Sequence, residues 1–384
     1  MTERMDALML PSNWQRVRLG DIAEIIGGGT PSTQITSFWN GSINWFTPTE
    51  IGITKYVYKS QRTITPLGLK KSSAKLLPIG TILLTSRASI GDCAILKEVA
   101  TTNQGFQSLI PLEKINNEFL YYLILTLKNK LLKLASGSTF LEVSPNKIKN
   151  LLIPLPPLNE QIAIANILSD VDHYLYSLDA LILKKEGVKK ALSFELLSQR
   201  KRLKGFNQAW QRVRLGDICE ITTGSLDANE MVHYGKYRFY TCAKEYYFID
   251  KYAFDTEAIL ISGNGAYVGY VHYYKGKFNA YQRTYVLDNF SEHIIFVKYF
   301  LTMFLQSHIQ TNKNESNTPY IVMATLKDFE ILLPPLNEQI AIANILSDAD
   351  HEIISLKNKK RQFENIKKAL NHDLMSAKIR VLKK

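Results

Sequence analysis

The chain contains 384 residues, of which 46% are hydrophobic and 21% are charged. This length predicts two or three domains, and the composition is that of a globular protein with buried cores rather than of a disordered chain. Lysine and arginine outnumber aspartate and glutamate by 47 to 35, which gives a formal net charge of +12. Such an excess favours a polyanionic partner, nucleic acid first, over a basic protein that has no such partner.

Nothing in the sequence indicates a membrane protein or a secreted one. No apolar run reaches the roughly 18 residues that a transmembrane helix needs, and the longest candidate, residues 294–305, includes Lys298 and is interpreted as a buried helix. The N-terminus contains acidic residues and no long apolar core, so it is not expected to be a signal peptide. Cys93, Cys219 and Cys242 are odd in number and far apart, which argues against a disulfide framework or a zinc site. We therefore expect a cytoplasmic protein.

Two sequence blocks occur twice without change. WQRVRLGDI occupies residues 14–22 and 210–218, and PPLNEQIAIANILSD occupies residues 156–170 and 334–348. The copies lie much further apart than the roughly 20–50 residues of solenoid or propeller repeats, so we interpret the pattern as the duplication of a whole unit. The order predicts a first variable domain, a first shared tail, a second variable domain and a second shared tail. Their ranges are 1–155, 156–204, 205–333 and 334–384.

The first variable domain is expected to mix helices and strands. Residues 80–86 (GTILLTS) are interpreted as a short buried strand that ends in small residues, and residues 117–134 as an amphipathic helix. A polar loop follows this helix and contains Ser138 and Thr139. The loop is a candidate for holding phosphates or bases, although most polar loops have no such role.

The first shared tail has the pattern of a long coiled-coil helix. Prolines precede it, Asn159 is a plausible N-cap, and Glu-Gln follows in the first turn. Seam positions then recur at alternating steps of three and four residues: Leu168, Val171, Leu175, Leu178, Ile182, Lys185, Lys189, Leu192 and Leu196. Sustained 3,4 spacing indicates a seam between helices rather than the face of a globular helix. A helix of about 40 residues would be roughly 60 Å long.

The second half of the chain repeats this order. Residues 257–263 (EAILISG) and 295–310 correspond to the strand and helix of the first domain, and the loop at residues 312–320 is again polar. The segment 234–248 (YGKYRFYTCAKEYYF) interleaves basic residues with tyrosine, which fits a strand core as well as a DNA contact. The second tail starts near Asn337 and repeats the seam: Leu346, Ala349, Ile353, Leu356, Lys360, Phe363, Lys367, Leu370 and Leu374.

Neither tail can bury its seam alone, so each is expected to pair with the other. Two copies joined head to tail predict a pseudo-two-fold axis, antiparallel helices and variable domains at opposite ends of a dumbbell. The predicted fold class is α+β, with two mixed α/β domains separated by a long antiparallel two-helix coiled coil.

Comparison of the two copies suggests which residues contact DNA. Positions that are the same in both, such as Gln104 and Gln282, are expected to serve the scaffold or the phosphate backbone. Arg87 follows the first predicted strand where Asn264 follows the second; arginine pairs with guanine and asparagine with adenine, so this difference would change the base that is read. The alternative is that both residues only solvate a turn. The candidate DNA contacts are Arg87, Asn103, Gln104, Ser138, Thr139, Asn264, Gln282, Arg283, Lys313 and Asn314.

The order of variable and shared segments resembles that of the specificity (S) subunit of type I restriction–modification systems. Residues 27–51 (GGGTPSTQITSFWNGSINWFTPTEI) are similar to the Gly-Thr-Pro and tryptophan-containing opening of many target recognition domains of this family. The segments ILLTSRASIGDCAI and TTNQGFQSL resemble the middle of such domains. The second domain opens differently, with TTGSLDANEMVHYGKYRFY, and is interpreted as a different recognition type.

The resemblance implies a role. Each target recognition domain would read one half of a bipartite, asymmetric site on double-stranded DNA, and the paired helices would fix the gap between the halves. The same helices would dock methyltransferase subunits that modify adenine with S-adenosylmethionine, and a separate motor and nuclease subunit would join for cleavage. The residues expected at the docking surface are Asn159, Glu160, Gln161, Asn337, Glu338 and Gln339.

No enzymatic motif accompanies this resemblance. Each Pro-Pro pair of the repeated block is followed by leucine, not by the Tyr or Phe of an Asn/Asp-Pro-Pro-Tyr/Phe methyltransferase motif, and no phosphate-binding Gly-x-x-x-x-Gly-Lys loop occurs. The repeated Asp-x-Asp-His at 170–173 and 348–351 is not expected to bind a metal, because residues two apart on a helix point about 200° apart. A non-catalytic subunit without cofactor or metal is therefore expected. The alternatives are a subunit of a system that only methylates, an enzyme with its own activity, and a scaffold without DNA contact.

A change in helix length should separate spacing from sequence reading. Inserting seven residues into each tail, beside Lys185 and Phe363, preserves the seam and adds about 10 Å. The gap should lengthen by up to roughly three base pairs of about 3.4 Å each, with both half-sites unchanged. Four inserted residues should disrupt assembly instead. Sequencing of methylated DNA measures both effects, and a change in the bases recognised after the seven-residue insertion would contradict the prediction.

Overall fold

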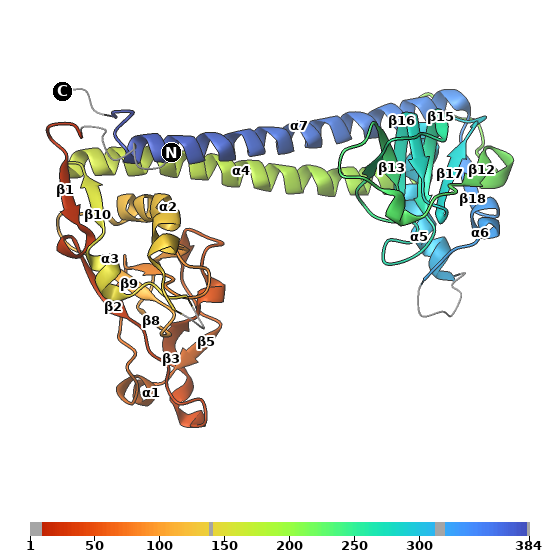
Figure 1. Cartoon of the computed structure of the whole chain (residues 1–384). Coiled ribbons are helices and arrows are strands. Elements are labelled where there is room, and N and C mark those ends of the chain that lie inside the picture. Colours follow the sequence, from red (N-terminus) through yellow and green to blue (C-terminus); the bar gives the residue numbers. More distant parts are fainter. Residues whose placement is uncertain (1–9, 138–140, 312–318, 382–384) are drawn as a thin grey trace. The chain divides into compact units, whose positions relative to one another are not determined.

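The computed structural model describes residues 10–137, 141–311 and 319–381 of the chain. These residues form a mixed α/β protein with two long helices, as the sequence predicts (Figure 1). The chain divides into two compact units, Met1–Leu178 together with Lys359–Lys384, and Asp179–Asn358. Within the described ranges, no helix combines the length and the apolar character that crossing a bilayer requires.

The first unit contains one variable domain built on two sheets and a strand pair. The strand pair is antiparallel, between β1 (Gln15–Arg18) and β10 (Leu152–Leu155). The five-stranded sheet has the order β2 (Ala23–Gly27), β9 (Gln107–Pro111), β6 (Ile82–Leu84), β7 (Cys93–Leu96) and β4 (Tyr56–Val57). The three-stranded sheet has the order β5 (Arg62–Ile64), β3 (Trp39–Phe46) and β8 (Ala100–Thr102). The helices are α1 (Pro66–Lys70), α2 (Asn117–Leu134) and α3 (Pro145–Lys149), with 3-10 turns at Leu19–Asp21, Thr36–Phe38 and Pro48–Glu50.

The second unit repeats the strand pair and the helix that follows the sheet. The antiparallel pair is β11 (Gln211–Arg214) with β18 (Glu330–Leu333). One six-stranded sheet has the order β12 (Glu220–Thr223), β17 (Thr284–Asp288), β15 (Phe254–Ser262), β16 (Val271–Ala280), β13 (Tyr237–Tyr240) and β14 (Tyr247–Ile249). The helices are α5 (Ile294–Thr311) and α6 (Met323–Lys327), with 3-10 turns at Leu215–Asp217 and Ala228–Glu230.

The predicted elements of both variable domains are confirmed. Helix α2 has the expected bounds, and α5 is one residue longer at each end than expected. The two expected strands correspond to β6 and β15, which begin and end at different residues from those predicted. The aromatic segment 234–248 supplies β13 and β14: Phe239 and Tyr240 are buried, whereas Tyr247 and Phe248 are exposed. It therefore serves as a strand core and also leaves aromatic rings on the surface.

The long helices are α4 (Leu158–Leu197) and α7 (Leu336–Met375), each of 40 residues. Both begin one residue before the asparagine, so Asn159 and Asn337 lie in the first turn and the expectation that they are N-caps was wrong. A carbonyl of the preceding proline accepts from the amides of the first turn instead. The asparagine oxygen still accepts a first-turn amide, from Glu160 N at 3.0 Å and from Glu338 N at 2.9 Å.

The predicted seam is confirmed, because all its positions on α4 and α7 are buried or half-buried. Within the first unit the rings of Tyr174 and Phe363 lie 4.6 Å apart. Within the second, Lys185 pairs with Glu352 at 2.7 Å. Two further seam lysines have acidic partners on the facing helix: Lys189 pairs with Asp350 and Lys367 pairs with Asp172. In each unit the facing residue on α7 has a lower number as the residue on α4 has a higher one, so the pairing is antiparallel.

The repeated block also packs against the variable domains. Ile164, Ala165 and Leu168 of α4 share one buried cluster with Leu120 and Leu123 of α2. The equivalent residues of α7 share a cluster with α5: Ile342, Ala343 and Leu346 with Phe296 and Leu301. Burying one such side chain contributes about 2 kcal/mol. The buried residues of the block therefore have the same packing role in both copies, against α2 in one and α5 in the other.

The Lys189–Asp350 pair predicts how the stability of the second unit depends on pH. Burial by itself raises the pKa of Asp350, but hydrogen bonds from Lys189 and Tyr299 outweigh it and hold the pKa below its ordinary value. A carboxylate with a lowered folded pKa stabilises the fold above its unfolded pKa of about 4 and loses that contribution as pH falls through the folded value. We expect Asp350→Asn to lower the free energy of unfolding by about 1 kcal/mol at pH 7.

This difference should shrink as the pH falls below about 4. Denaturant unfolding followed by circular dichroism between pH 7 and pH 3 measures it. Asp348→Asn, two residues earlier on the exposed side of α7, serves as the control and should change little. A deficit of Asp350→Asn that stays constant down to pH 3 would contradict the assignment.

Candidate nucleic-acid interface

Three loops of the first variable domain meet where strand β6 ends. Ser86 N donates to Gly105 O at 2.8 Å, and Val143 N donates to Ser86 O at 3.0 Å. The loop after β6, the loop after β8 and the segment before α3 are therefore held together by backbone hydrogen bonds. We call this the first loop cluster. It places Arg87 next to the segment that contains Asn103.

Arg87 is exposed on this cluster and oriented by an acidic neighbour. Its Nε lies 3.1 Å from Glu142 Oε2, and the side chains of the two residues are 41% and 34% exposed. Glu142 is itself fixed by two backbone hydrogen bonds with Ser136, at 3.0 and 3.1 Å. This pair engages Nε, and the Arg87 side chain stays exposed to solvent. Ser138 and Thr139, also expected here, lie outside the described residues.

The glycine-rich opening packs against the same cluster. A side chain at Gly28 would place its Cβ 2.0 Å from Asn103 O, so only glycine fits this approach. Thr30 Oγ1 on this loop donates to Gln104 Oε1, and Asn103 Oδ1 accepts from Gly105 N at 2.8 Å. Gln104 is exposed, and its side chain is held by the hydrogen bond from Thr30 of the glycine-rich opening. The side chain of Asn103 instead stabilises its own turn.

Two tryptophans of the opening support this loop. Trp45 Nε1 donates to Gly29 O at 2.8 Å, and its ring meets that of Trp39 edge to face at 5.0 Å. The Arg62 guanidinium lies 3.8 Å from the Trp39 ring centroid, a cation–π contact. The tryptophans that mark the opening in sequence thus set the shape of the loop.

The second variable domain builds an equivalent cluster, which we call the second loop cluster. Gly263 N donates to Arg283 O at 2.8 Å, and Ile321 N donates to Gly263 O at 2.9 Å. The cluster brings together Asn264, Gln282 and Arg283, of which Gln282 and Arg283 are exposed. Lys313 and Asn314 lie outside the described residues.

Two tyrosines close to Asn264 in the chain, Tyr267 and Tyr270, were not singled out from the sequence, whereas Lys244 belongs to the segment 234–248. Lys244 Nζ lies 5.1 Å from the ring centroid of Tyr267, and Tyr267 and Tyr270 are 43% and 38% exposed. A hollow of about 380 Å³ is lined by these two tyrosines and by Gln306 of α5. The sequence signal for the two tyrosines was only their position a few residues after Asn264.

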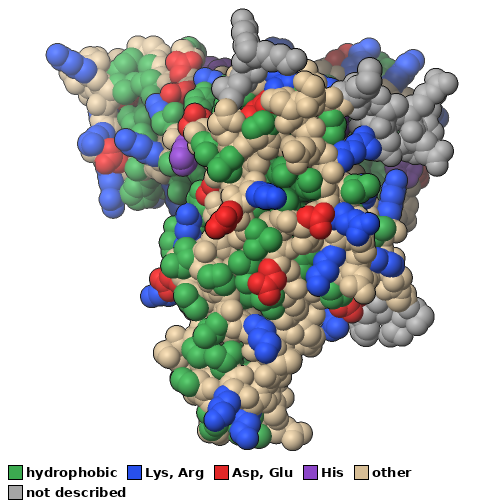
Figure 2. Space-filling view, turned by 90° about the vertical axis from the view of Figure 1, so that its left-hand side faces the viewer, with side chains coloured by type: hydrophobic (Ala, Val, Ile, Leu, Met, Phe, Trp, Pro, Cys, Tyr) green, Lys and Arg blue, Asp and Glu red, His purple; other side chains and the backbone are tan. Residues whose placement is uncertain are grey.

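Basic side chains on the face of the first variable domain that Figure 2 shows do not form one uniform patch. On the face of the first domain shown in Figure 2, lysine and arginine are interspersed with acidic residues, and the charged side chains visible at the lower tip are all basic. The loop clusters therefore offer hydrogen-bond donors and positive charge. Their candidate residues are arginine, asparagine and glutamine, side chains that recognise base edges and phosphates rather than catalyse a reaction.

A buried carboxylate stands at the start of each long helix. Glu160 is 1% exposed; it accepts a hydrogen bond from Trp14 Nε1 at 3.1 Å and a two-pronged pair from Arg380 at 2.7 and 3.1 Å. Each donor is far from Glu160 in sequence. A buried carboxylate is stable only when it is paired in this way.

The second unit contains the same arrangement. Glu338 is fully buried; Trp210 Nε1 donates to it at 3.1 Å and Arg202 donates at 3.2 and 2.6 Å. Arg202 follows the end of α4, and Arg380 follows the end of α7. In each unit, then, the segment after one long helix closes on the start of the other, and the tryptophan of the repeated WQRVRLGDI block joins the contact.

The neighbouring glutamines connect each helix to the variable domain. Gln161 Oε1 accepts from Asn116 N at 2.8 Å, at the start of α2, and its Nε2 donates to Pro156 O at 2.9 Å. Gln339 accepts from His293 N at 3.0 Å, before α5. Of the six expected docking residues, Asn159 and Asn337 are exposed, and the two glutamates and two glutamines are buried with partners inside the chain.

The exposed residues of the repeated block form one stripe. They are the same in both copies: Leu158, Asn159, Ile162, Asn166 and Asp170 on α4, and Leu336, Asn337, Ile340, Asn344 and Asp348 on α7. At about 100° per residue these positions fall within an arc of about 120° on each helix. We call each set an outer stripe. The apolar residues of the stripes are 40–52% exposed.

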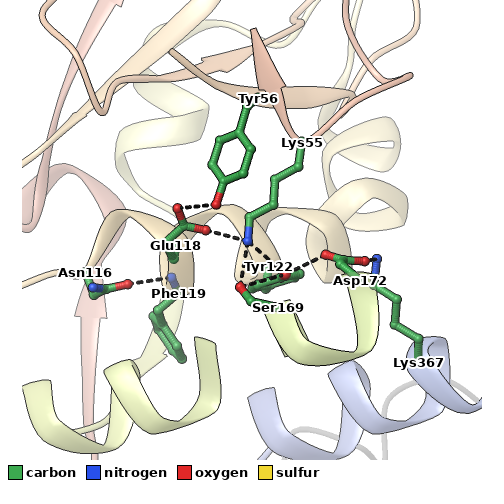
Figure 3. A network of polar contacts seen from close by, with 9 residues as sticks. All are labelled: Lys55, Tyr56, Asn116, Glu118, Phe119, Tyr122, Ser169, Asp172 and Lys367. Atoms are coloured by element: carbon green, nitrogen blue, oxygen red, sulfur yellow. Dashed lines mark hydrogen bonds and ion pairs between the residues drawn. The ribbon is translucent and has the colours of Figure 1, made fainter. Parts of the chain in front are cut away.

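A polar network joins the first variable domain to both long helices (Figure 3). Tyr122 Oη of α2 donates to Asp172 Oδ2 of α4 at 2.5 Å, and Asp172 pairs with Lys367 of α7. Burial and the hydrogen bond to Asp172 raise the pKa of Tyr122, so the phenol stays protonated and acts as donor. Lys55 Nζ lies 2.5 Å from Glu118 Oε2 and donates to Tyr122 Oη at 2.9 Å and to Ser169 Oγ at 2.8 Å.

The second unit has a related network. Tyr299 Oη of α5 donates to Asp350 Oδ2 of α7 at 2.7 Å, and Asp350 pairs with Lys189 of α4. Burial raises the pKa of Tyr299 and lowers that of Lys298, its neighbour on α5. Asp170 is exposed while Asp172 is buried, so the two aspartates of the repeated Asp-x-Asp-His lie on different faces, as helix geometry predicts.

Comparison with known proteins gives one consistent result. A family model described as the type I restriction modification DNA specificity domain matches residues 11–185 and 207–365. The MjaIX type I restriction enzyme specificity subunit of Methanocaldococcus jannaschii is 29% identical over 97% of this chain and 95% of its own length. The EcoDI specificity subunit of Escherichia coli is 36% identical, over 44% of this chain and 37% of its own length.

Solved structures share the fold. The S subunit of a type I restriction-modification system from M. genitalium aligns over 96% of this chain and 98% of its own, with a TM-score of 0.62 and 19% identity. A structure described as showing complex assembly and conformational transition of the type I R-M system aligns over 96% and 99%, with a TM-score of 0.62 and 18% identity.

Proposed function

The chain belongs to the type I restriction modification DNA specificity family, and on this basis we propose that it is the DNA-recognition subunit of a type I restriction–modification complex. Each variable domain reads one half of a bipartite, asymmetric site on double-stranded DNA, and the paired helices set the gap between the halves. In this role the chain catalyses nothing itself; adenine methylation and cleavage belong to separate methyltransferase and motor/nuclease subunits.

The observation that carries the proposal is one loop frame that occurs twice with different side chains at the same place, an exposed arginine in the first copy and a half-buried asparagine in the second. The backbone contacts of the two loop clusters match, but Arg87 on the first corresponds to Asn264 on the second. Arginine pairs with two acceptors of guanine, and asparagine pairs with adenine. The net charge of +12 supplies attraction to phosphate. Two loop clusters with the same backbone contacts but different base-contacting side chains suit an asymmetric two-part site.

The outer stripes support docking of two identical partners. Internal packing accounts for the buried residues of the repeated block but not for the exposed ones. Of these, Asn159 and Asn337 accept a hydrogen bond only from the next amide of their own helix. The identity of the exposed residues in both copies points to a surface that binds the same partner twice. The partner that fits a type I complex is a pair of methyltransferase subunits, and each stripe offers them an apolar start followed by polar residues.

Replacing one domain tests the reading function. Exchange of residues 27–154 for the first domain of another family member should change one half of the methylated site and leave the other half and the gap intact. The changed chain is co-expressed with its methyltransferase, and methylated positions are mapped by long-read sequencing. A shifted gap with unchanged half-sites would show that the domains do not read sequence.

Charge placed on the outer stripes tests docking. Ile162→Glu or Ile340→Glu puts a carboxylate where apolar area must be buried, which should weaken binding of one methyltransferase copy at least tenfold. The double variant should lose both copies while the chain stays folded. Native mass spectrometry of the assembled complex gives the number of copies bound.

Leu183→Glu is the control for this experiment. Leu183 is 71% exposed on α4 but lies outside the repeated block, so its variant should keep two copies. Two copies bound by the Ile162→Glu, Ile340→Glu double variant would rule out the outer stripes as the docking surface.

A further inference from the structure

Lys55 is a buried lysine that ties the sheet of the first variable domain to helix α4. Its backbone oxygen accepts from Ile95 N of β7 at 2.8 Å, so the residue is part of the sheet edge. Its side chain leaves the sheet and reaches Glu118 and Tyr122 on α2 and Ser169 on α4 (Figure 3). The side chain is only 6% exposed, and a charge so deeply buried persists only where its partners are fixed.

The contacts of Lys55 differ in kind from the packing around them. Apolar residues of α2 and α4 share one core, and that contact is strong but non-directional, so it tolerates small rotations. The hydrogen bonds of Lys55 depend on distance and angle. A small rotation of the sheet against α4 would lengthen the bonds to Ser169 and Tyr122 and leave a buried charge short of partners. Packing therefore holds the domain on the helices, and the polar network selects one angle.

The network continues from α4 to the facing helix. Tyr122 Oη accepts a hydrogen bond from Lys55 and donates one to Asp172. Asp172 in turn pairs with Lys367 of α7. The sheet of the first domain is thus connected through side chains to both helices of the pair. In the second unit the tyrosine, aspartate and lysine recur as Tyr299, Asp350 and Lys189, but the additional lysine, Lys298, lies on α5 beside the tyrosine and not on a sheet strand.

We infer that Lys55 is a positioning residue that fixes the angle of the first variable domain on the helix pair and so restricts the DNA gap to one length. The inference rests on the proposed function, since a gap has meaning only for a bipartite site. Lys55 need not touch DNA for this role. A domain free to rotate would reach half-sites one base pair nearer or farther with the same reading loops.

The test is the gap selectivity of the complete complex. The chain is assembled with its methyltransferase, and methylation rates are measured on duplexes with the cognate gap and with gaps one base pair shorter and longer. Lys55→Met keeps the length and apolar bulk of the side chain but removes its hydrogen bonds. We expect the ratio of off-gap to cognate methylation to rise about fivefold, the effect of losing one such bond, with the same bases read in each half-site.

Two further variants make the result decisive. Lys59→Met removes an exposed lysine four residues along the chain and should leave the ratio at its wild-type value even if overall methylation falls. Lys55→Met combined with Glu118→Gln avoids leaving the half-buried Glu118 carboxylate with Tyr56 Oη but no cation beside it, so it should recover thermal stability and still show the raised ratio. This separates positioning from simple loss of fold.

A wild-type ratio in the stable double variant would overturn the inference while leaving the proposed function intact. Equal methylation of all gaps by the wild-type complex would overturn the proposed function, and the inference with it. A raised ratio accompanied by changed half-site bases would also contradict the inference, because it would place Lys55 in sequence reading.

Discussion

Each long helix of this protein begins with a carboxylate that the fold buries, and the fold depends on how that charge is neutralised. Glu160 and Glu338 have almost no exposed surface, and each receives an arginine from beyond the end of the other long helix and an indole from the start of a variable domain. A buried carboxylate without such partners would cost several kcal/mol. The helix start, the opposite helix end and the domain opening must therefore assemble together.

This constraint explains why the chain is a duplication. Arg202 closes on Glu338 and Arg380 closes on Glu160, so each repeat completes the other. Once the frame is fixed, the loops at the strand ends are free to differ. Arg87 and Asn264 occupy matching places on loop clusters whose backbone hydrogen bonds are the same. A stable frame with exchangeable readers suits the recognition of two unlike half-sites.

Polar contacts in the interior set geometry where apolar packing sets stability. The seam between α4 and α7 is mainly apolar, but lysines within it pair with carboxylates on the facing helix, and Tyr122 and Tyr299 connect those pairs to the domains. Such pairs contribute little net stability because desolvation offsets their attraction. Their directionality is what an apolar seam lacks, and under the proposed function the angle of a domain matters as much as its affinity for the helices.

The sequence alone determined the duplication, the two long helices, their antiparallel seam and the main strand and helix of each domain, because these depend on periodicity and local propensity. The 3,4 spacing placed the seam correctly, and the bounds of α2 were predicted without error. Comparison of the two copies also placed Arg87 and Asn264 at matching loop positions, and their contact with DNA stays a prediction. The predicted N-caps, Asn159 and Asn337, lie two residues after the residues that precede α4 and α7. Helix ends depend on neighbouring backbone groups, which the sequence pattern does not show.

The tertiary structure alone decided which polar residues are inside. Glu160, Gln161 and Lys55 are of types that are usually exposed, and nothing near them in sequence predicts otherwise. Their partners, Arg380 for Glu160 and Ser169 for Lys55, lie more than a hundred residues away. The sequence also could not divide the identical residues of the repeated block into a buried face and an outer stripe. That division depends on the packing of α2 and α5 against the block. A charge is buried where distant partners converge on it, and that convergence is a property of the fold.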